Sequence, residues 1–391
     1  MKLATRISRI SVSQTMAVNE KALQLRAQGV DLVDFGAGEP DFPTPENIKQ
    51  AGIRAIQEDF TRYTAIGGMN ELRTAIVEKH ARDFGSRYEP AECLVNVGGK
   101  HAIFNIVSAM IDEGDEVIIP TPYWVSFADI ARYAGGATIF VPTREEDGFR
   151  LTAGMLEKAL TPKTRLVIAN SPSNPSGAVI DDDEFVKIAA LCRDNGVYVL
   201  SDECYAFFLY GGRKPFSIAS QAEFKNNVMI AGSVSKTYAM TGWRIGFVLG
   251  PKELVSAIQK LQSHSTSNPT SVAQKAALEA LTGPQDSVQR MLSEYTRRRN
   301  FVVERLRSIP GVRCAEPGGA FYAYPNISAA FSRGVRDSLD FSVKLLEKAH
   351  VAVVPGEAFG TADHIRISYA TSMEQLDKGL RRMGEFMASL T

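Results

Sequence analysis

The sequence predicts an α/β fold with a mostly parallel sheet, helices on both of its faces, and a smaller α+β domain. Between residues 94 and 249, short apolar runs alternate with helical stretches, as in a parallel sheet whose strands are buried on both faces. After residue 249 the pattern is mainly helical, and a long stretch, Val288–Ile309, is expected to bridge to a second domain. The expected division is an N-terminal arm with part of the small domain (1–44), a large domain (45–285) and a small C-terminal domain (286–391).

The N-terminal arm leads into a short apolar strand, Leu32–Phe35. Gly36 and Gly38 follow this strand. A dinucleotide-binding motif would need a helix next, but several prolines break the chain there instead. We expect Thr44 to cap the next helix, with Pro45 at its first position.

The remaining elements follow from short apolar runs and from helical periodicity. Strands are expected at Leu94–Val97, Glu116–Ile119, Ala137–Val141, Arg165–Ala169, Tyr198–Leu200, Val228–Ala231, Ile245–Leu249, Val351–Val354 and His364–Ser368. Helices are expected from Gly98 onward and at Val125–Tyr133, Leu156–Leu160, Phe185–Asp194, Leu254–Gln262, Val272–Leu281, Phe341–Ala349 and Met373–Ala388.

Four polar or aromatic residues follow the expected strands of the large domain. Trp124 comes after the second strand, Asn174 after the fourth, Asp202 after the fifth and Lys236 after the sixth. Ligands of parallel sheets bind beyond the carboxyl ends of the strands. The pattern therefore predicts a ligand site at this edge of the sheet.

The stretch from Ser233 to Arg244 has the groups needed to hold a phosphorylated aldehyde. Lys236 can condense with a carbonyl, as lysines do with pyridoxal phosphate, and Ser233, Ser235 and Arg244 offer donors for a phosphate. A lysine between serines is usually solvated. Here apolar runs on both sides suspend the loop between two buried strands, which favours pyridoxal phosphate as cofactor.

Asp202 directly follows an apolar strand, where a carboxylate is costly to bury without a charged partner. A protonated pyridine nitrogen is such a partner; a helix cap or a surface carboxylate is the alternative. Tyr205 and Asn174 are expected near the ring oxygen of the cofactor. Trp124 offers a flat face for stacking on the ring, although a lone tryptophan is more often part of a core.

Gly99 and Lys100 lie where a glycine turn opens a helix. Unpaired amides and the helix dipole make such a turn an anion site, so both are candidates for binding the phosphate through their backbone. Glycine turns of this kind are also common at helix starts that bind no ligand.

Several motifs resemble those of the class I aminotransferases of fold type I, which depend on pyridoxal phosphate. They are the stretch Ser233–Arg244, Asn174-Pro175-Ser176-Gly177, Ser201–Tyr205 and His364–Tyr369, and together they cover nearly the whole chain. The likeness is strongest to the bacterial branch of aspartate and aspartate/prephenate aminotransferases. The resemblance implies transfer of an amino group from an amino acid to a 2-oxo acid, with Lys236 as the catalytic residue.

The resemblance also implies roles for residues with no signal of their own. Gly38 is expected beside the substrate carboxylate, and Arg366 is expected to bind the α-carboxylate with two hydrogen bonds. Tyr63 is expected to reach the cofactor phosphate of a partner subunit in a homodimer. Residues 262–269 lack the arginine that one branch uses for a distal carboxylate, so Lys100 and Thr15 are expected to take that role.

Three alternatives stay open. One is an aminotransferase for aromatic or neutral amino acids, and a second is a carbon–sulfur lyase on the same scaffold, since fold alone does not fix the reaction. A non-catalytic regulator with this fold is the third, but such proteins usually carry a DNA-binding domain.

Composition narrows the class of protein further. The 391 residues include 44 lysines and arginines and 44 aspartates and glutamates. The net charge is therefore zero and does not favour binding to nucleic acid or to a membrane surface. No apolar run approaches the roughly 20 residues that span a bilayer. The four cysteines are expected as free thiols, and neither they nor the five histidines show the spacing of metal ligands. We expect a cytoplasmic protein without a metal site.

Overall fold

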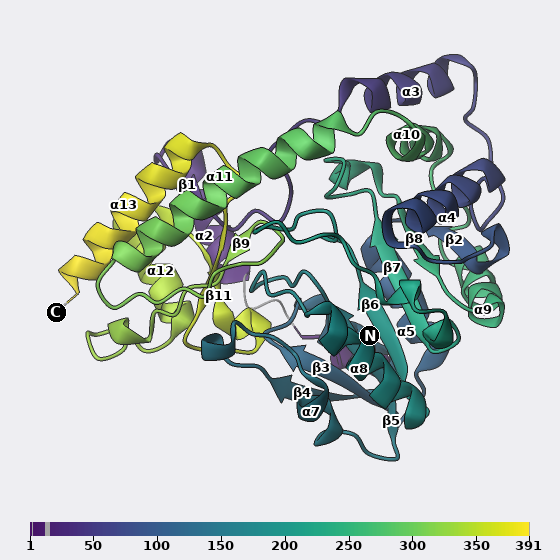
Figure 1. The fold of residues 1–391 in the computed structure, drawn as a ribbon. Helices are drawn as coiled ribbons and strands as arrows, with labels where there is room; N and C mark the ends of the chain where they lie inside the picture. Colours follow the sequence, from purple (N-terminus) through teal and green to yellow (C-terminus); the bar gives the residue numbers. More distant parts are fainter. Residues whose placement is uncertain (2, 12–15, 391) are drawn as a thin grey trace.

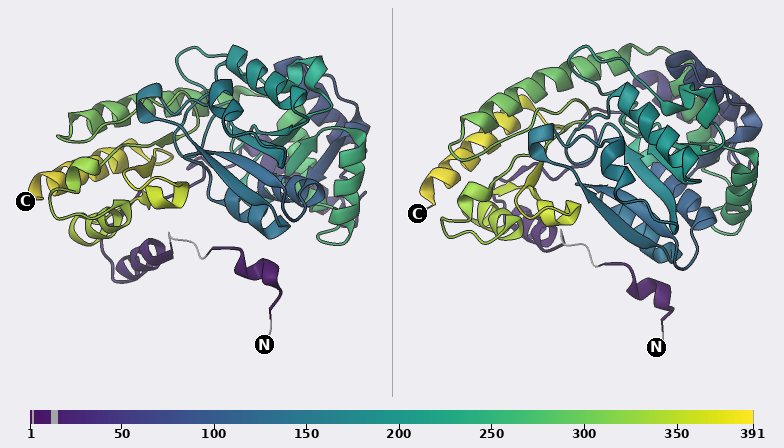
Figure 2. Two further views of the ribbon diagram at one scale, coloured as in Figure 1. Left: turned by 90° about the horizontal axis from the view of Figure 1, so that it is seen from below. Right: turned by 60° about the horizontal axis from the view of Figure 1, so that its bottom comes forward.

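The structure, a computed structural model, describes residues 1, 3–11 and 16–390. A large half built on a seven-stranded sheet lies beside a smaller half, and the long helix α11 (Asp286–Ser308) extends from one to the other (Figure 1). The short helix α1 (Thr5–Ser8) lies at the edge of the molecule, where it contacts helix α6 (Ser126–Ala134) of the large half (Figure 2). The predicted class, an α/β fold with a smaller α+β part, is confirmed.

The sheet of the large half has the strand order β2-β8-β7-β6-β5-β3-β4, in which only β8 runs antiparallel to its neighbours. Its strands are β2 (Cys93–Asn96), β3 (Glu116–Thr121), β4 (Ala137–Pro142), β5 (Thr164–Asn170), β6 (Tyr198–Asp202), β7 (Val228–Ser233) and β8 (Gly246–Leu249). Its helices are α3 (Glu46–Gln57), α4 (Asn70–Phe84), α5 (Gly99–Met110), α6 (Ser126–Ala134), α7 (Ala153–Glu157), α8 (Asp182–Asp194), α9 (Lys252–Ser263) and α10 (Ser271–Thr282).

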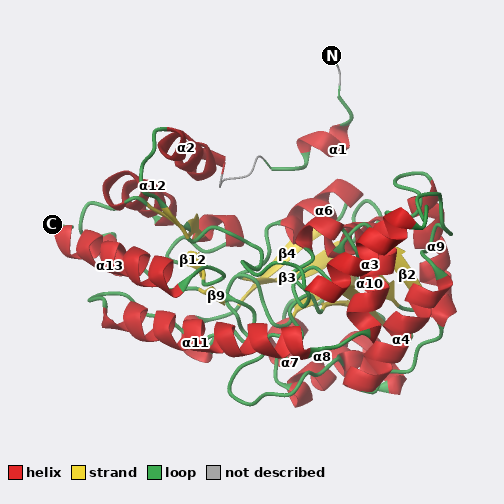
Figure 3. Cartoon of the chain, turned by 90° about the horizontal axis from the view of Figure 1, so that it is seen from above, coloured by secondary structure: helices red, strands yellow, loops and turns green. Residues whose placement is uncertain are grey.

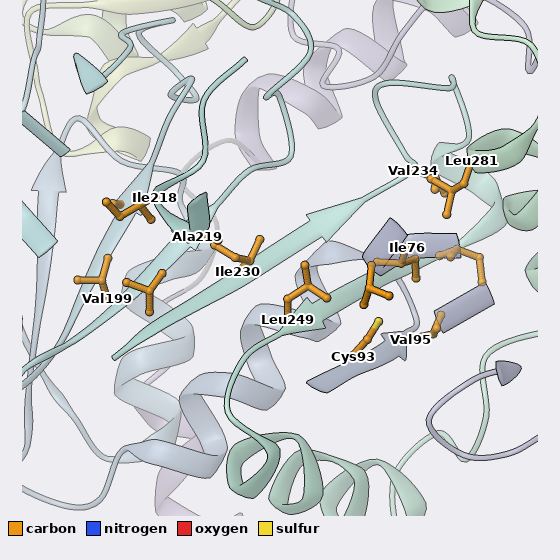
Figure 4. Packing of buried hydrophobic residues seen from close by; sticks show 14 of the residues in the cluster. Ile76, Cys93, Val95, Val199, Ile218, Ala219, Ile230, Val234, Leu249 and Leu281 are labelled. Carbon is orange, nitrogen blue, oxygen red and sulfur yellow. The ribbon is translucent and has the colours of Figure 1, made fainter. Parts of the chain in front are cut away.

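Helices cover both faces of this sheet because its strands are apolar on both sides. In β3, Ile118 packs into one core, with residues of α4, α8 and α10, while Val117 and Ile119 pack into another, with residues of α5, α6 and α9. The period-2 alternation of a strand divides its side chains in this way. Figure 4 shows part of the first core, where Ile230 of β7, Leu249 of β8 and Val95 of β2 lie along the same face.

The smaller half has its own core. It contains the antiparallel sheet β11-β12-β9 and the parallel pair β1–β10. Its elements are α2 (Met16–Ala27), β1 (Val33–Asp34), β9 (Tyr322–Ala323), α12 (Ser338–Ala349), β10 (Val351–Ala352), β11 (Val354–Pro355), β12 (Ile365–Ser368) and α13 (Met373–Ser389). Helices α11 and α13 lie side by side over this core (Figure 3).

One strand expected in the smaller half is divided in two. Val351 pairs with Val33 of β1, whereas Val354 pairs with Arg366 of β12. The apolar run changes partners within a few residues, so it belongs to two sheets.

The expectation that Thr44 caps a helix is wrong. Helix α3 begins at Glu46 with Pro45 at its N-cap and without a side-chain cap. The hydroxyl of Thr44 instead donates to the carbonyl of Ala239 at 2.6 Å and accepts from Trp243 Nε1 at 3.1 Å. Thr44 therefore anchors the loop that carries Lys236.

Helix α11 takes part in both cores. Val288, near its start, packs with the sheet of the large half, and Tyr295 and Val302 pack in the smaller half. Arg298 lies on the same helix and forms an ion pair with Asp41 at 2.8 Å.

The division of the chain into domains at residues 44/45 and 285/286 stays a prediction. No helix in the described part of the chain is long and apolar enough to cross a membrane.

Candidate active site

A cavity of about 270 Å³ opens at the carboxyl ends of β5, β6 and β7, where the sequence predicts a ligand site. It brings together most of the predicted site residues: Gly38, Gly99, Lys100, Trp124, Asn174, Asp202, Tyr205, Ser233, Ser235, Lys236, Arg244 and Arg366. Tyr63 is not among its lining residues and is 90% exposed. Thr15 lies outside the described residues.

The parallel register explains why these residues meet. Asn170 and Asp202, the last residues of β5 and β6, are neighbours of Ala231 in β7, so β5 and β6 end at one level and β7 continues two residues further. Ser233 ends β7, and the following loop places Lys236 in front of the strand ends. The site is thus set by strand ends that the core holds in register.

Lys236 lies inside this cavity. Its Nζ donates a hydrogen bond to the carbonyl of Gly38, from the loop after β1. Burial lowers the pKa of Lys236 below the usual value of a lysine, although the negative charge of Glu39 opposes the shift. A lowered pKa increases the share of neutral amine, the form that attacks carbonyls and accepts protons.

Asp202 is the carboxyl group at the end of β6. Burial raises its pKa to about 7, while a hydrogen bond from the amide of Cys204 at 3.1 Å and the positive charge of Lys236 act in the opposite direction. A buried carboxyl group with so few donors is stabilised in its charged form by a cation brought to it. A protonated pyridine nitrogen, such as that of pyridoxal phosphate, is a cation that would fit this requirement.

A second part of the cavity has the donors for a phosphate. The hydroxyl of Ser233 lies 2.8 Å from that of Ser235, and the amide of Gly99 opens helix α5 beside them. A Cβ at Gly98 would lie 2.1 Å from Arg244 Nη2, so the glycine is what lets this guanidinium approach the turn. The donor set therefore fits the phosphate of pyridoxal phosphate.

Arg366 comes from β12 of the smaller half. Its Nη1 donates to Asn174 Oδ1 at 3.1 Å and its Nη2 to the carbonyl of Gly36 at 2.8 Å. Its guanidinium carbon lies 4.5 Å from the ring centre of Tyr322, and its Nε is buried with no hydrogen-bond partner among the described residues. An arginine held flat in this way suits a carboxylate.

Lys100 Nζ lies 5.0 Å from the ring centre of Trp124, within the range of a cation–π contact. Burial lowers the pKa of Lys100, and the positive charge of Arg244 adds to that effect. Two cations at one end of the cavity make it attractive to anions.

Sequence reasoning missed three polar residues of the cavity. Asn170 ends β5, accepts from the amide of Asn174 at 2.8 Å and could have been found from its place at a strand end. The hydroxyl of Tyr322 lies 2.8 Å from that of Tyr205, and Thr241 donates to Glu39 at 2.7 Å. The contacts of Tyr322 with Tyr205 and of Thr241 with Glu39 join segments far apart in the sequence, so no local sequence pattern predicts them.

Comparison with protein families gives one match over most of the chain. The model of the family described as aminotransferase class I and II matches residues 30–383. The aspartate aminotransferase of Geobacillus stearothermophilus is 46% identical over 389 residues, 99% of each chain. The aspartate/prephenate aminotransferase of Nitrosomonas europaea is 43% identical over 397 residues, covering 99% of this chain and all of its relative.

Solved structures give the same picture. The aspartate aminotransferase from Rhizobium meliloti superimposes with a TM-score of 0.95 at 41% identity, and each chain is covered completely. The aspartate aminotransferase from Thermus thermophilus with maleate has a TM-score of 0.94 at 42% identity, covering 98% of this chain and 99% of the other.

The raised pKa of Asp202 gives a pH-dependent contribution to stability. Between its ordinary value of 3.8 and about 7, the native carboxyl keeps a proton that the unfolded chain releases, so stability falls as pH rises through this window. We expect Asp202→Asn to raise the free energy of unfolding of the cofactor-free protein, relative to wild type, by about 3 kcal/mol more at pH 8 than at pH 5. Urea denaturation at both pH values measures the difference. Asp183→Asn, at an exposed position, is the control; equal pH dependence in wild type and Asp202→Asn would contradict the expectation.

Proposed function

The chain belongs to the class I and II aminotransferase family, and from this premise we propose that it transfers the amino group of aspartate to 2-oxoglutarate. Enzymes of class I use pyridoxal phosphate, and their substrates are amino acids and 2-oxo acids. The observation that supports the proposal most directly is the single cavity that gathers Lys236, Asp202, Arg244 and Arg366.

Bound pyridoxal phosphate supplies an electron sink for the charge that develops when a substrate Cα–H bond breaks. The proposed role of Lys236 is to bind the cofactor and then to carry the proton from Cα as a neutral amine. The buried site supports this role, because burial lowers the pKa of its ammonium form. When bound substrate excludes water from the cavity, the electrostatic interactions of the reacting groups become stronger.

The other residues are proposed to bind and orient. Asp202 keeps the ring nitrogen protonated, while Ser233, Ser235 and Arg244 hold the phosphate. Arg366 binds the α-carboxylate and so turns the Cα–H bond toward Lys236, which is catalysis by positioning. Asn174, a hydrogen-bond partner of Arg366, supports its orientation.

The substrate preference rests on Lys100 and on the relatives. The relatives named above carry the names of aspartate and aspartate/prephenate aminotransferases, and one was solved with the dicarboxylate maleate. Lys100 offers a further cation in the cavity for a distal carboxylate, and Thr15 is proposed to close the pocket beside it. Prephenate, which also carries a second carboxylate, fits the same proposal.

We further propose a cytoplasmic homodimer in which Tyr63 completes the cofactor site of the partner subunit. Tyr63 is 90% exposed, and on the preceding helix α3 Ile53 and Ile56 are 43% and 57% exposed and present apolar side chains to solvent. Exposed apolar residues that gather in this way support an interface with a second copy of the chain.

The central experiment concerns Lys236. Lys236→Ala is expected to lower the rate of transamination by about 10³-fold or more, because the proton carrier is lost, while the phosphate donors still hold the cofactor. Borohydride reduction of the wild-type protein followed by peptide mapping is expected to place the cofactor on Lys236. Lys260→Ala, on the exposed side of α9, is the control and keeps full activity. A label on Lys100 or Lys260 would refute the assignment.

Lys100→Ser tests the distal carboxylate. The variant keeps the backbone amide at the start of α5 but removes the charge. We expect kcat/KM for aspartate to fall about ten- to hundredfold, which corresponds to one charge-assisted hydrogen bond, and kcat/KM for alanine or phenylalanine to change little. An equal loss for dicarboxylate and neutral donors would show that the side chain does not select the substrate.

A mixing experiment tests the shared site. A homodimer of Tyr63→Ala or of Lys236→Ala has a lesion in both of its sites, so neither homodimer is expected to be fully active. A heterodimer of the two variants has both lesions in one site and none in the other. Activity per heterodimer is therefore expected to recover to about half that of wild type by symmetry. Mass spectrometry verifies that heterodimers form. Verified heterodimers without recovered activity would mean that each chain completes its own site.

A further inference from the structure

Glu203 follows Asp202 directly, but it takes no part in the active-site cavity. Its side chain borders a separate small cavity together with His80 and Lys79 of α4. Only 6% of the Glu203 side chain is exposed, and 4% of that of His80. The end of β6 therefore buries two neighbouring carboxyl groups, one on the cofactor side and one on the side of α4.

Glu203 is held by three hydrogen-bond donors. Ser217 Oγ donates at 2.5 Å and Ser201 Oγ at 3.3 Å to Oε1, and His80 Nε2 lies 3.1 Å from Oε2. His80 Nδ1 in turn lies 2.7 Å from the hydroxyl of Ser86. A neutral ring with its proton on Nε2 satisfies both contacts, because it donates to Glu203 and accepts from Ser86. The arrangement suits an ionised Glu203.

Glu203 is held by hydroxyls and a histidine ring, and no lysine or arginine of the described residues forms an ion pair with it. Lys79, beside it, is already paired with Asp83 at 2.8 Å. The hydroxyl of Tyr88 has no hydrogen-bond partner among the described residues, and its pKa is raised by burial and by the charges of Glu203 and Glu92. On its other side Glu203 borders a cavity lined by further charged groups: Asp181, Asp182, Asp183, Arg213 and Lys214.

The charge of Glu203 acts on Asp202. Burial is the main reason why the pKa of Asp202 rises, and the negative charge of Glu203 raises it further. The two residues are consecutive at the end of β6, and both side chains are buried, although they face different cavities. At so short a distance along the chain, the negative charge of one carboxylate favours a proton on the other. Groups close to Asp202 share this effect. With the cofactor bound, those groups include the ring nitrogen proposed to face Asp202.

We propose that Glu203 and His80 are positioning residues for the cofactor: the buried Glu203 carboxylate, held in place by His80, keeps a proton within the pair formed by Asp202 and the ring nitrogen. The proposal rests on the proposed function, since it needs Asp202 to face that nitrogen. Neither residue touches the reacting atoms, and His80 acts only through Glu203.

The first test follows Asp202 in the cofactor-free full-length chain. Carbon-13 NMR of aspartate-labelled protein records the titration of each carboxyl group, and Asp202→Asn identifies its signal. Glu203→Gln has nearly the same shape and removes the charge. We expect it to lower the titration midpoint of Asp202 by about one pH unit, the size of a Coulomb interaction between near neighbours in a protein. An unchanged midpoint in a variant that unfolds at the wild-type temperature would overturn the proposal.

Variants of His80 test how Glu203 is held. His80→Phe leaves an oxygen of Glu203 buried without its donor, which disfavours the charged carboxylate, so the midpoint of Asp202 is expected to fall as in Glu203→Gln. His80→Gln places an amide donor near the position of Nε2 and is expected to restore the wild-type midpoint. Adding His80→Phe to Glu203→Gln is expected to change nothing more. A further shift in the double variant would mean that His80 acts on Asp202 by another route.

The second test uses the holoenzyme loaded with ring-¹⁵N pyridoxal phosphate. The ¹⁵N chemical shift reports the proton on the ring nitrogen, and Glu203→Gln is expected to release it about one pH unit lower than wild type. If Asp202 responds but the ring nitrogen does not, the coupling stops at Asp202 and the proposal fails. If both respond while Asp202→Asn keeps full transamination, the coupling stands and the catalytic role of Asp202 falls instead.

Discussion

The burial of a carboxyl group at the end of β6 is the constraint on which the site depends. Asp202 is 6% exposed, and the amide of Cys204 alone does not replace the water that it loses. Its raised pKa records that cost. Under the role proposed for Asp202, a cationic ring nitrogen would offset that cost by pairing with the carboxylate, which would link binding of the cofactor to the stability of this strand end.

The sheet determines where Asp202 and its neighbours lie, because the pairing of the strands fixes where each strand ends. Apolar side chains on both faces of β5, β6 and β7 hold the three strands in register, and their polar groups therefore meet at one level. The smaller half closes the cavity from the other side with Arg366 and Tyr322. Contacts across the halves, namely Arg366 with Asn174 and Tyr322 with Tyr205, keep that second wall in place.

Much of this arrangement could be predicted from the sequence, because it depends on local pattern. Apolar runs give the strands, and the polar residue after each run gives the edge of the site. What failed depends on tertiary contacts. Threonine is a residue type that often caps helices, but Thr44 forms hydrogen bonds with Trp243 and Ala239 instead. Tyr322 reaches Tyr205 from a separate sheet. The run Val351–Val354 looks like one strand because its sequence does not record a change of partners.

The cations of the cavity differ in how strictly they select an anion. Arg366 is fixed by hydrogen bonds to Asn174 and Gly36 and by the face of Tyr322, so its fork has one orientation. Lys100 rests on Trp124 as a point charge on a flexible stem. Under the proposed roles, the α-carboxylate is bound in one geometry, while the distal carboxylate needs only to come near a charge. Such a site accepts distal carboxylates at more than one distance from Cα, as an enzyme that alternates between aspartate and glutamate requires.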